Sequence, residues 1–87
     1  MVDTKARQQL EDTLKKRELS QAALARALGI SAVSVNAWLA GRSRPEAHLR
    51  RALSQILAID PLSWETDDER AQFEGAVERG RSFAEAA

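Results

Sequence analysis

The segment from Ser20 to Ser31 constrains the fold more than any other part of this chain. Serine is a preferred N-cap, and each of these serines opens a short run whose apolar residues recur at helical spacing. Gly29 lies between them and suits the left-handed backbone that ends many helices. The segment therefore predicts two short helices, over residues 21–28 and 32–40, joined by a tight turn.

Residue types that commonly cap helices also recur through the rest of the chain, and no strand pattern is present. We therefore predict an all-α fold, a compact domain of four to five helices followed by a C-terminal helix. The further expected elements are a first helix from Asp3 or Thr4 to about Arg17, a fourth helix with Pro45 in its first turn, a short turn from Asp60-Pro61 to Trp64, and a last helix opened by the capping box Thr66-Asp67-Asp68-Glu69.

Each expected helix carries apolar residues at i, i+3 and i+4, which defines one buried face. Leu24, Leu28, Val35 and Trp38 are the expected scaffold that fixes the angle between the two short helices. The other expected core residues are Leu10, Leu14, Leu39, Leu49, Leu53, Ile56, Leu57 and Trp64.

Composition excludes several classes of chemistry. The 87 residues include no cysteine and one histidine, so a disulfide framework, a zinc–thiolate site and a multi-histidine metal site are ruled out. No nucleophile with an adjacent base and no phosphate-cradling loop is visible. We therefore expect no enzyme activity, no metal and no cofactor. No apolar run reaches the length of a membrane span, so we expect a soluble cytoplasmic protein without a membrane partner.

The charges are balanced overall, with 13 basic and 13 acidic residues, but they are segregated along the chain. Residues 1–54 hold 10 basic and 5 acidic groups, whereas residues 55–87 hold 3 basic and 8 acidic groups. Such segregation indicates that the N-terminal part meets a polyanion and the C-terminal part does not. Chance segregation in a short chain is the alternative.

The chain resembles the phage repressor and Cro family of helix-turn-helix domains, which have the lambda-repressor-like fold. No single residue carries this resemblance, which covers roughly residues 8–64. It rests on Leu19-Ser20-Gln21, Leu24-Ala25 and Leu28-Gly29-Ile30-Ser31, on Val35, Trp38 and Gly41, and on Pro45 followed by Leu49, Leu53, Leu57 and Ile59.

The resemblance implies that the helix after Ser31 enters the major groove of double-stranded DNA. Members use the positions of Ala32, Val33 and Ala37 on bases, and Ser34 and Asn36 lie on or beside the same outward face. The positions expected at phosphates are Gln21, Ser31 (which is also a helix cap), Arg42 and Arg44. Their alternative roles are ordinary solvated turn and loop residues.

Two departures from the family pattern stand out. Many members carry Gln, Arg or Asn at the base-facing positions, where this chain has Ala32, Val33 and Ala37. Methyl contacts to thymine, with Ser34, Asn36 and DNA shape, are therefore expected to carry the readout. Members also often pair an arginine with a glutamate at the positions of Leu14 and Leu39, and apolar packing replaces that ion pair here.

We divide the chain into a DNA-binding domain, residues 1–64, and an acidic C-terminal extension, residues 65–87. The extension carries an apolar stripe of Phe73, Val77, Gly80 and Ala84, and a break is expected near Gly80. A second subunit is the favoured cover for this stripe. Packing back onto the domain and a separate protein partner are the alternatives.

These patterns predict a sequence-specific DNA-binding protein, a small repressor-like transcriptional regulator of phage or bacterial type that binds operator half-sites as a homodimer. It would be associated with the nucleoid through DNA. The alternative is a helical protein-interaction module or antitoxin-type protein with the same fold.

Overall fold

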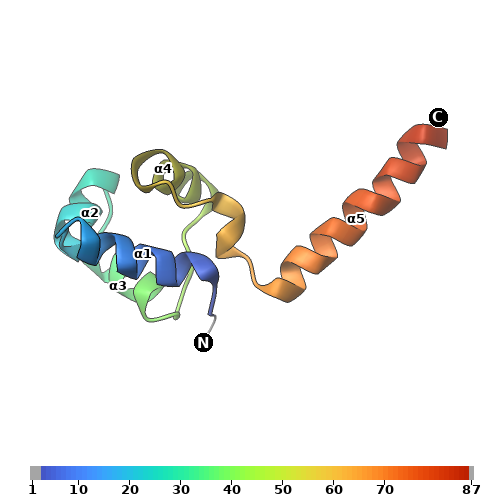
Figure 1. The fold of residues 1–87 in the computed structure, drawn as a ribbon. Coiled ribbons are helices and arrows are strands. Elements are labelled where there is room, and N and C mark those ends of the chain that lie inside the picture. The colour runs from blue at the N-terminus through green and yellow to red at the C-terminus, as the bar shows by residue number, and fades with distance from the viewer. Residues whose placement is uncertain (1–2, 87) are drawn as a thin grey trace.

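The computed structural model describes residues 3–86, and this part of the chain is all-α without a strand (Figure 1). This confirms the predicted fold class. The elements are α1 (Lys5–Lys16), α2 (Gln21–Leu28), α3 (Ala32–Leu39), α4 (Ala47–Leu57), the short 3-10 helix η1 (Pro61–Trp64) and α5 (Asp67–Ala86).

The helices begin where the capping residues predicted. The side-chain oxygen of Thr4 accepts a hydrogen bond from the backbone N–H of Arg7 at 3.3 Å and starts α1. Ser20 and Ser31 cap α2 and α3 in the same way. Each bond satisfies an N–H group that a helix leaves unpaired in its first turn. Gly29 ends α2 with φ of 70°, in the left-handed region.

Two predicted boundaries were wrong by a residue or two. Pro45 lies before α4 rather than in its first turn, because Glu46 holds the extended N-cap conformation and the helix begins at Ala47. Helix α3 ends at Leu39, since Ala40 is its C-cap and Gly41 then turns the chain with φ of 75°.

The core is built from residues of α1, α2, α3, α4 and η1. Four core residues have an exposed fraction of one per cent or less, namely Leu10, Val35, Leu53 and Trp64. The Trp64 ring meets the ring of Trp38 edge to face, with centroids 6.4 Å apart, so both tryptophans serve as core residues. Ile56 does not, because it lies on the solvent side of α4 and is exposed.

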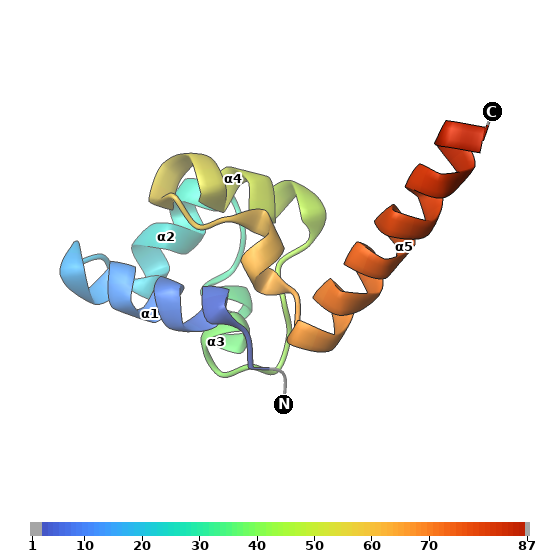
Figure 2. The same ribbon diagram turned by 45° about the vertical axis from the view of Figure 1, so that its right-hand side comes forward.

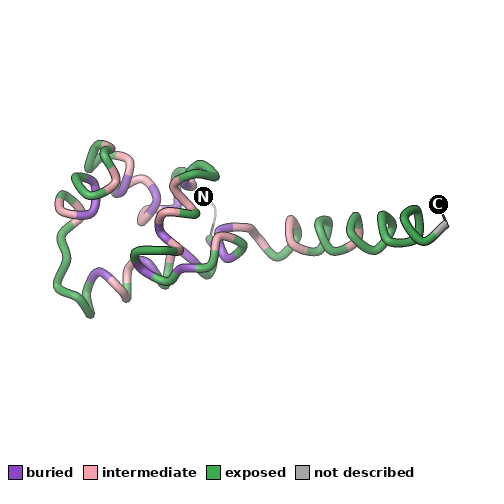
Figure 3. Tube along the Cα trace, turned by 90° about the horizontal axis from the view of Figure 1, so that it is seen from above, coloured by how far each residue is buried: buried purple, intermediate pink, exposed green. Residues whose placement is uncertain are grey.

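Helix α5 projects away from the other helices in both ribbon views (Figures 1 and 2). It lengthens the molecule to 51 Å, against 24 and 21 Å in the other directions. Beyond its first turn it is almost entirely exposed (Figure 3). The expected break near Gly80 was wrong, because α5 is continuous to Ala86. Phe73 and Val77 are exposed, so nothing in the described chain buries the stripe.

Ala58 offers a test of how α4 ends. It is exposed and left-handed, with φ of 58°, a conformation that costs a residue with a Cβ roughly 1–2 kcal/mol. We expect Ala58→Gly to raise the free energy of unfolding by about 0.5–1 kcal/mol, after allowing for the greater freedom of glycine in the unfolded chain. Urea denaturation measures the change. Ala27→Gly, in the body of α2, is the control and should lower stability by up to about 1 kcal/mol.

Candidate nucleic-acid interface

Helices α2 and α3 form a fixed pair with one shared buried side. Their axes differ in direction by 118°, and Gly29, Ile30 and Ser31 connect them. Angles of roughly 90–120° across a turn of three or four residues are typical of paired helices that present the second helix to DNA. Leu24 of α2 and Val35 and Trp38 of α3 lie in the core, and Leu28 packs half-buried against it.

The opposite side of α3 faces outward and carries small side chains. Ser31, Ala32, Val33 and Asn36 are exposed, and Val33 is the most open of the large apolar residues in the domain, at 75%. Ser34 and Ala37 lie half-buried along the edges of this face. The Ser31 and Ser34 hydroxyls are 3.2 Å apart, and the Ser31 oxygen also caps α3.

Asn36 connects this face to two of the expected phosphate residues. Its Oδ1 accepts a hydrogen bond from Arg42 Nη2 at 2.8 Å, and its Nδ2 donates a longer bond of 3.4 Å to Gln21 Oε1. The three side chains thus come from the start of α2, the outer face of α3 and the loop after it. The amide of Asn36 orients the guanidinium of Arg42, which is otherwise exposed.

Arg44 lies apart from this group, although it is only two residues from Arg42. Its Nη1 donates to Glu69 Oε1 of α5 at 2.5 Å and to the backbone carbonyl of Trp64 at 3.3 Å. Its side chain is 28% exposed. The structure therefore brings Gln21, Asn36 and Arg42 together and holds Arg44 at the junction with α5.

The carboxylate of Glu69 is the centre of that junction. It accepts a hydrogen bond from the backbone N–H of Thr66, while the Thr66 hydroxyl accepts one from the backbone N–H of Glu69. This is the predicted capping box, and Arg44 adds a charged donor to it. The hydrogen bond from Arg44, followed by that from the Thr66 backbone, lowers the pKa of the Glu69 carboxyl from 4.5 to about 2.

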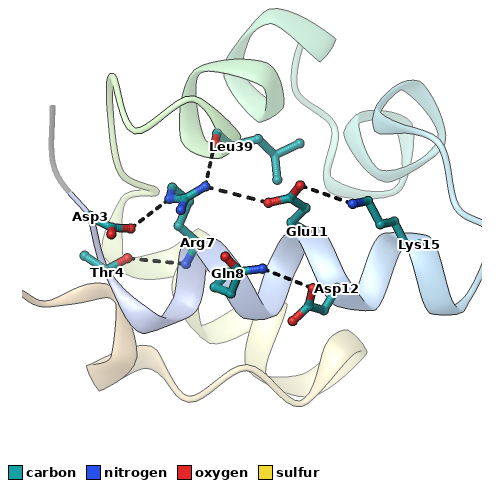
Figure 4. Close-up of polar contacts among 8 residues, drawn as sticks. All are labelled: Asp3, Thr4, Arg7, Gln8, Glu11, Asp12, Lys15 and Leu39. Atoms are coloured by element: carbon teal, nitrogen blue, oxygen red, sulfur yellow. Dashed lines mark hydrogen bonds and ion pairs between the residues drawn. The ribbon is translucent and has the colours of Figure 1, made fainter.

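Arg7 is a structural residue that the sequence analysis missed. Its guanidinium pairs with Asp3 at 2.9 Å and with Glu11 at 3.7 Å, and Nη1 donates to the carbonyl of Leu39 at 3.3 Å (Figure 4). Helix α3 has no basic residue in its own last turn, so Arg7 supplies a cation to its C-terminal end. The spacing of Arg7 from the two carboxylates, four residues each way, was the available signal.

A family model for helix-turn-helix domains matches residues 10–64, more than half of the chain. The chain belongs to this family. The match is to helix-turn-helix proteins of the phage repressor and Cro type, so the resemblance found in the sequence is confirmed, and with it the lambda-repressor-like fold. The family consists of DNA-binding regulators, and DNA binding with a role in transcription is the function that membership supports. No curated protein and no solved structure matches the chain significantly.

Two further findings concern residues 3–86 of this helix-turn-helix protein. No group of three or more His, Cys, Asp or Glu side chains is arranged to hold a metal ion in this part of the chain. No single helix there is long and apolar enough to cross a membrane, and α2 and α3 reach the required length and hydropathy only when the two are added together across their 118° bend.

The lowered pKa of Glu69 predicts how the junction responds to acid. Because the folded-state pKa lies below the unfolded value, the stabilisation by this carboxylate is present above about pH 4.5 and is lost as the pH falls towards 2. We expect the Glu69 carboxyl carbon to titrate near pH 2 by NMR, and at a clearly higher pH in Arg44→Ala, where only the hydrogen bonds with Thr66 still lower the pKa. Titration of Glu69 near pH 4.5 in the unaltered protein would contradict the described contact.

Proposed function

We propose that this helix-turn-helix protein is a sequence-specific, repressor-like regulator that binds operator half-sites as a homodimer, with α3 in the major groove. The observation that carries the proposal is the outward face of α3, exposed at Ala32 and Val33 while Val35 and Trp38 fix the opposite side. A helix fits the major groove, where each base pair offers a distinct set of chemical groups. The N-terminal residues of the second helix meet the base edges in this docking mode.

The apolar character of the face favours recognition of thymine. Ala32, Val33 and Ala37 have no side-chain donor or acceptor, so they discriminate bases through contact with the thymine methyl group. Val33 offers the largest and most exposed apolar surface of the three. Ser34 and Asn36 supply hydrogen-bonding groups beside it.

Phosphate contacts surround this face. Arg42 is exposed and oriented by Asn36, and Gln21 and Ser31 lie at the N-terminal ends of α2 and α3. Backbone N–H groups at helix N-termini favour anions, and the guanidinium matches a phosphate as a charged fork. Arg44 reaches a phosphate only after it leaves Glu69, so its contribution is expected to be smaller than that of Arg42.

The small number of base pairs that one subunit can contact favours a homodimer. One helix-turn-helix reads too few base pairs for tight binding, and such domains act as two-fold dimers on half-sites about one helical turn apart. We assign DNA binding to residues 1–64 and association to residues 65–87. The exposure of Phe73 and Val77 supports this division, because the stripe has no cover within its own chain.

The thymine contact is tested by replacing single operator thymines with uracil, which removes one methyl group. We expect a loss of affinity at one symmetric pair of positions, on the order of 0.8 kcal/mol per methyl, or a few-fold. The loss should vanish in Val33→Ala, because that variant no longer has the side chain that buries the methyl. A fluorescence-anisotropy titration on a selected operator measures it.

A matched control is Ala32→Gly, which removes one methyl group from the same face, whereas Val33→Ala removes two. If uracil is tolerated everywhere while G·C substitutions at the same positions are rejected, hydrogen bonds from Asn36 and Ser34 carry the specificity instead. If selection yields no preferred sequence, the protein is not a sequence-specific regulator.

The phosphate contact is tested by the salt dependence of DNA binding. We expect Arg42→Ala to weaken binding to operator and random DNA alike and to lower the slope of log K against log salt by about one for each subunit. Arg44→Ala should lower the slope by less, because Glu69 already neutralises this guanidinium. An unchanged slope in Arg42→Ala would show that the loop after α3 does not meet the DNA backbone.

A further inference from the structure

The exposed stripe of α5 starts at the domain and continues into solvent. Glu69, four residues before Phe73, points to Arg44, and the same side of the helix then presents Phe73, Val77 and Gly80. At 100° per residue, Phe73, Val77, Gly80 and Ala84 fall within an arc of about 60°. Phe73 is 52% exposed and Val77 is 37% exposed.

Neither the space around position 80 nor its backbone conformation requires a glycine there within the single chain. A Cβ added there would meet nothing within 4 Å, and its φ does not lie in the region that favours glycine. Glycine within a helix costs about 1 kcal/mol relative to alanine. A small residue that is unfavourable for the helix and unneeded by its own chain is expected where a second surface approaches closely.

We propose that α5 pairs with α5 of a second copy in an antiparallel arrangement, centred between Val77 and Gly80. This inference rests on the homodimer of the proposed function and adds its interface and orientation. About that centre, Val77 lies opposite Gly80 of the second copy, and Phe73 lies opposite Ala84. Each large side chain therefore meets a small one, which is how packed helices fill the space between them.

A parallel pair would not pack in this way. Phe73 would lie opposite Phe73 and Gly80 opposite Gly80, which forces the helices apart at one level and leaves a void at the other. Phe83 gives a second reason to favour the antiparallel arrangement over the parallel one. It is 80% exposed on one border of the stripe, and the antiparallel arrangement brings it near Ala76 of the second copy.

Charges on the other border agree with the same orientation. Glu74 and Arg81 flank the stripe, and together with Phe73, Val77 and Glu78 they line a shallow groove. In the antiparallel pair, Glu74 of each copy lies close to Arg81 of the other, giving two opposite-charge pairs. Antiparallel helices also place the positive end of one helix dipole beside the negative end of the other.

The close approach at Gly80 is tested with the full chain and no DNA, by sedimentation equilibrium. The unaltered protein is expected to form dimers at high micromolar concentration. Gly80→Leu should weaken dimerisation about tenfold or more, because the added side chain meets Val77 of the second copy. Gly75→Leu is the matched control. Gly75 lies on the opposite side of α5, where a Cβ meets only the mobile end of Arg79 at 3.3 Å, so dimerisation should be unchanged.

The orientation is tested by reversing and then exchanging the border charges. Glu74→Arg and Arg81→Glu should each weaken the dimer about three- to tenfold, because each creates two like-charge contacts. The double variant E74R/R81E restores opposite charges only in the antiparallel pair, so it should recover the original affinity within about twofold. Circular dichroism of each variant checks that α5 remains helical.

The outcomes separate the inference from the proposed function. A dimer that Gly80→Leu leaves intact, or that the double variant fails to restore, overturns the antiparallel pairing while the homodimer stands. A full-length protein that stays monomeric at high micromolar concentration overturns both the pairing and the homodimer. Operator binding, measured separately, then shows whether the DNA-binding part of the proposed function survives.

Discussion

The close packing of α2 on α3 is the constraint on which the rest of the structure depends. Ala25 of α2 and Val35 of α3 are both buried in the core that the two helices share. Gly29 then turns the chain, and the N–H of Ile30 bonds to the carbonyl of Ala25. Because these residues fix the 118° angle, they also fix the outward position of Val33.

The rest of the domain holds this pair in place from the α1 side by two different means. Leu14 is buried and Leu39 packs against the core. Apolar packing avoids the desolvation of two buried charges. Arg7 of α1 then donates a hydrogen bond to the backbone carbonyl of Leu39 at the end of α3, and its guanidinium remains partly exposed to solvent. Helix α3 is thus fixed without a charged residue of its own in its last turn.

The sequence predicted the helix caps and the apolar core, but it missed the ion pairs of Arg7 and the contact between Arg44 and Glu69. The capping box of Thr66 and Glu69 was predictable because its partners are three residues apart. The bond from Arg44 to Glu69 spans 25 residues, so charge pattern alone left Arg44 as a loop residue free to meet phosphate. Gly80 shows a different limit: local propensity predicted a break, but the twenty residues of α5 supply enough consecutive hydrogen bonds to include both Gly75 and Gly80.

The junction at Arg44 makes α5 a lever. Its twenty residues extend about 30 Å from a single anchored turn, since each adds about 1.5 Å. A rotation of about 10° at that turn displaces the far end by roughly 5 Å, which is one helical turn in length. A contact at the far end of α5 would therefore position the whole domain relative to that contact through the same three side chains, Arg44, Thr66 and Glu69. A small change in the contact between Arg44 and Glu69 would therefore move the far end of α5 by several ångströms.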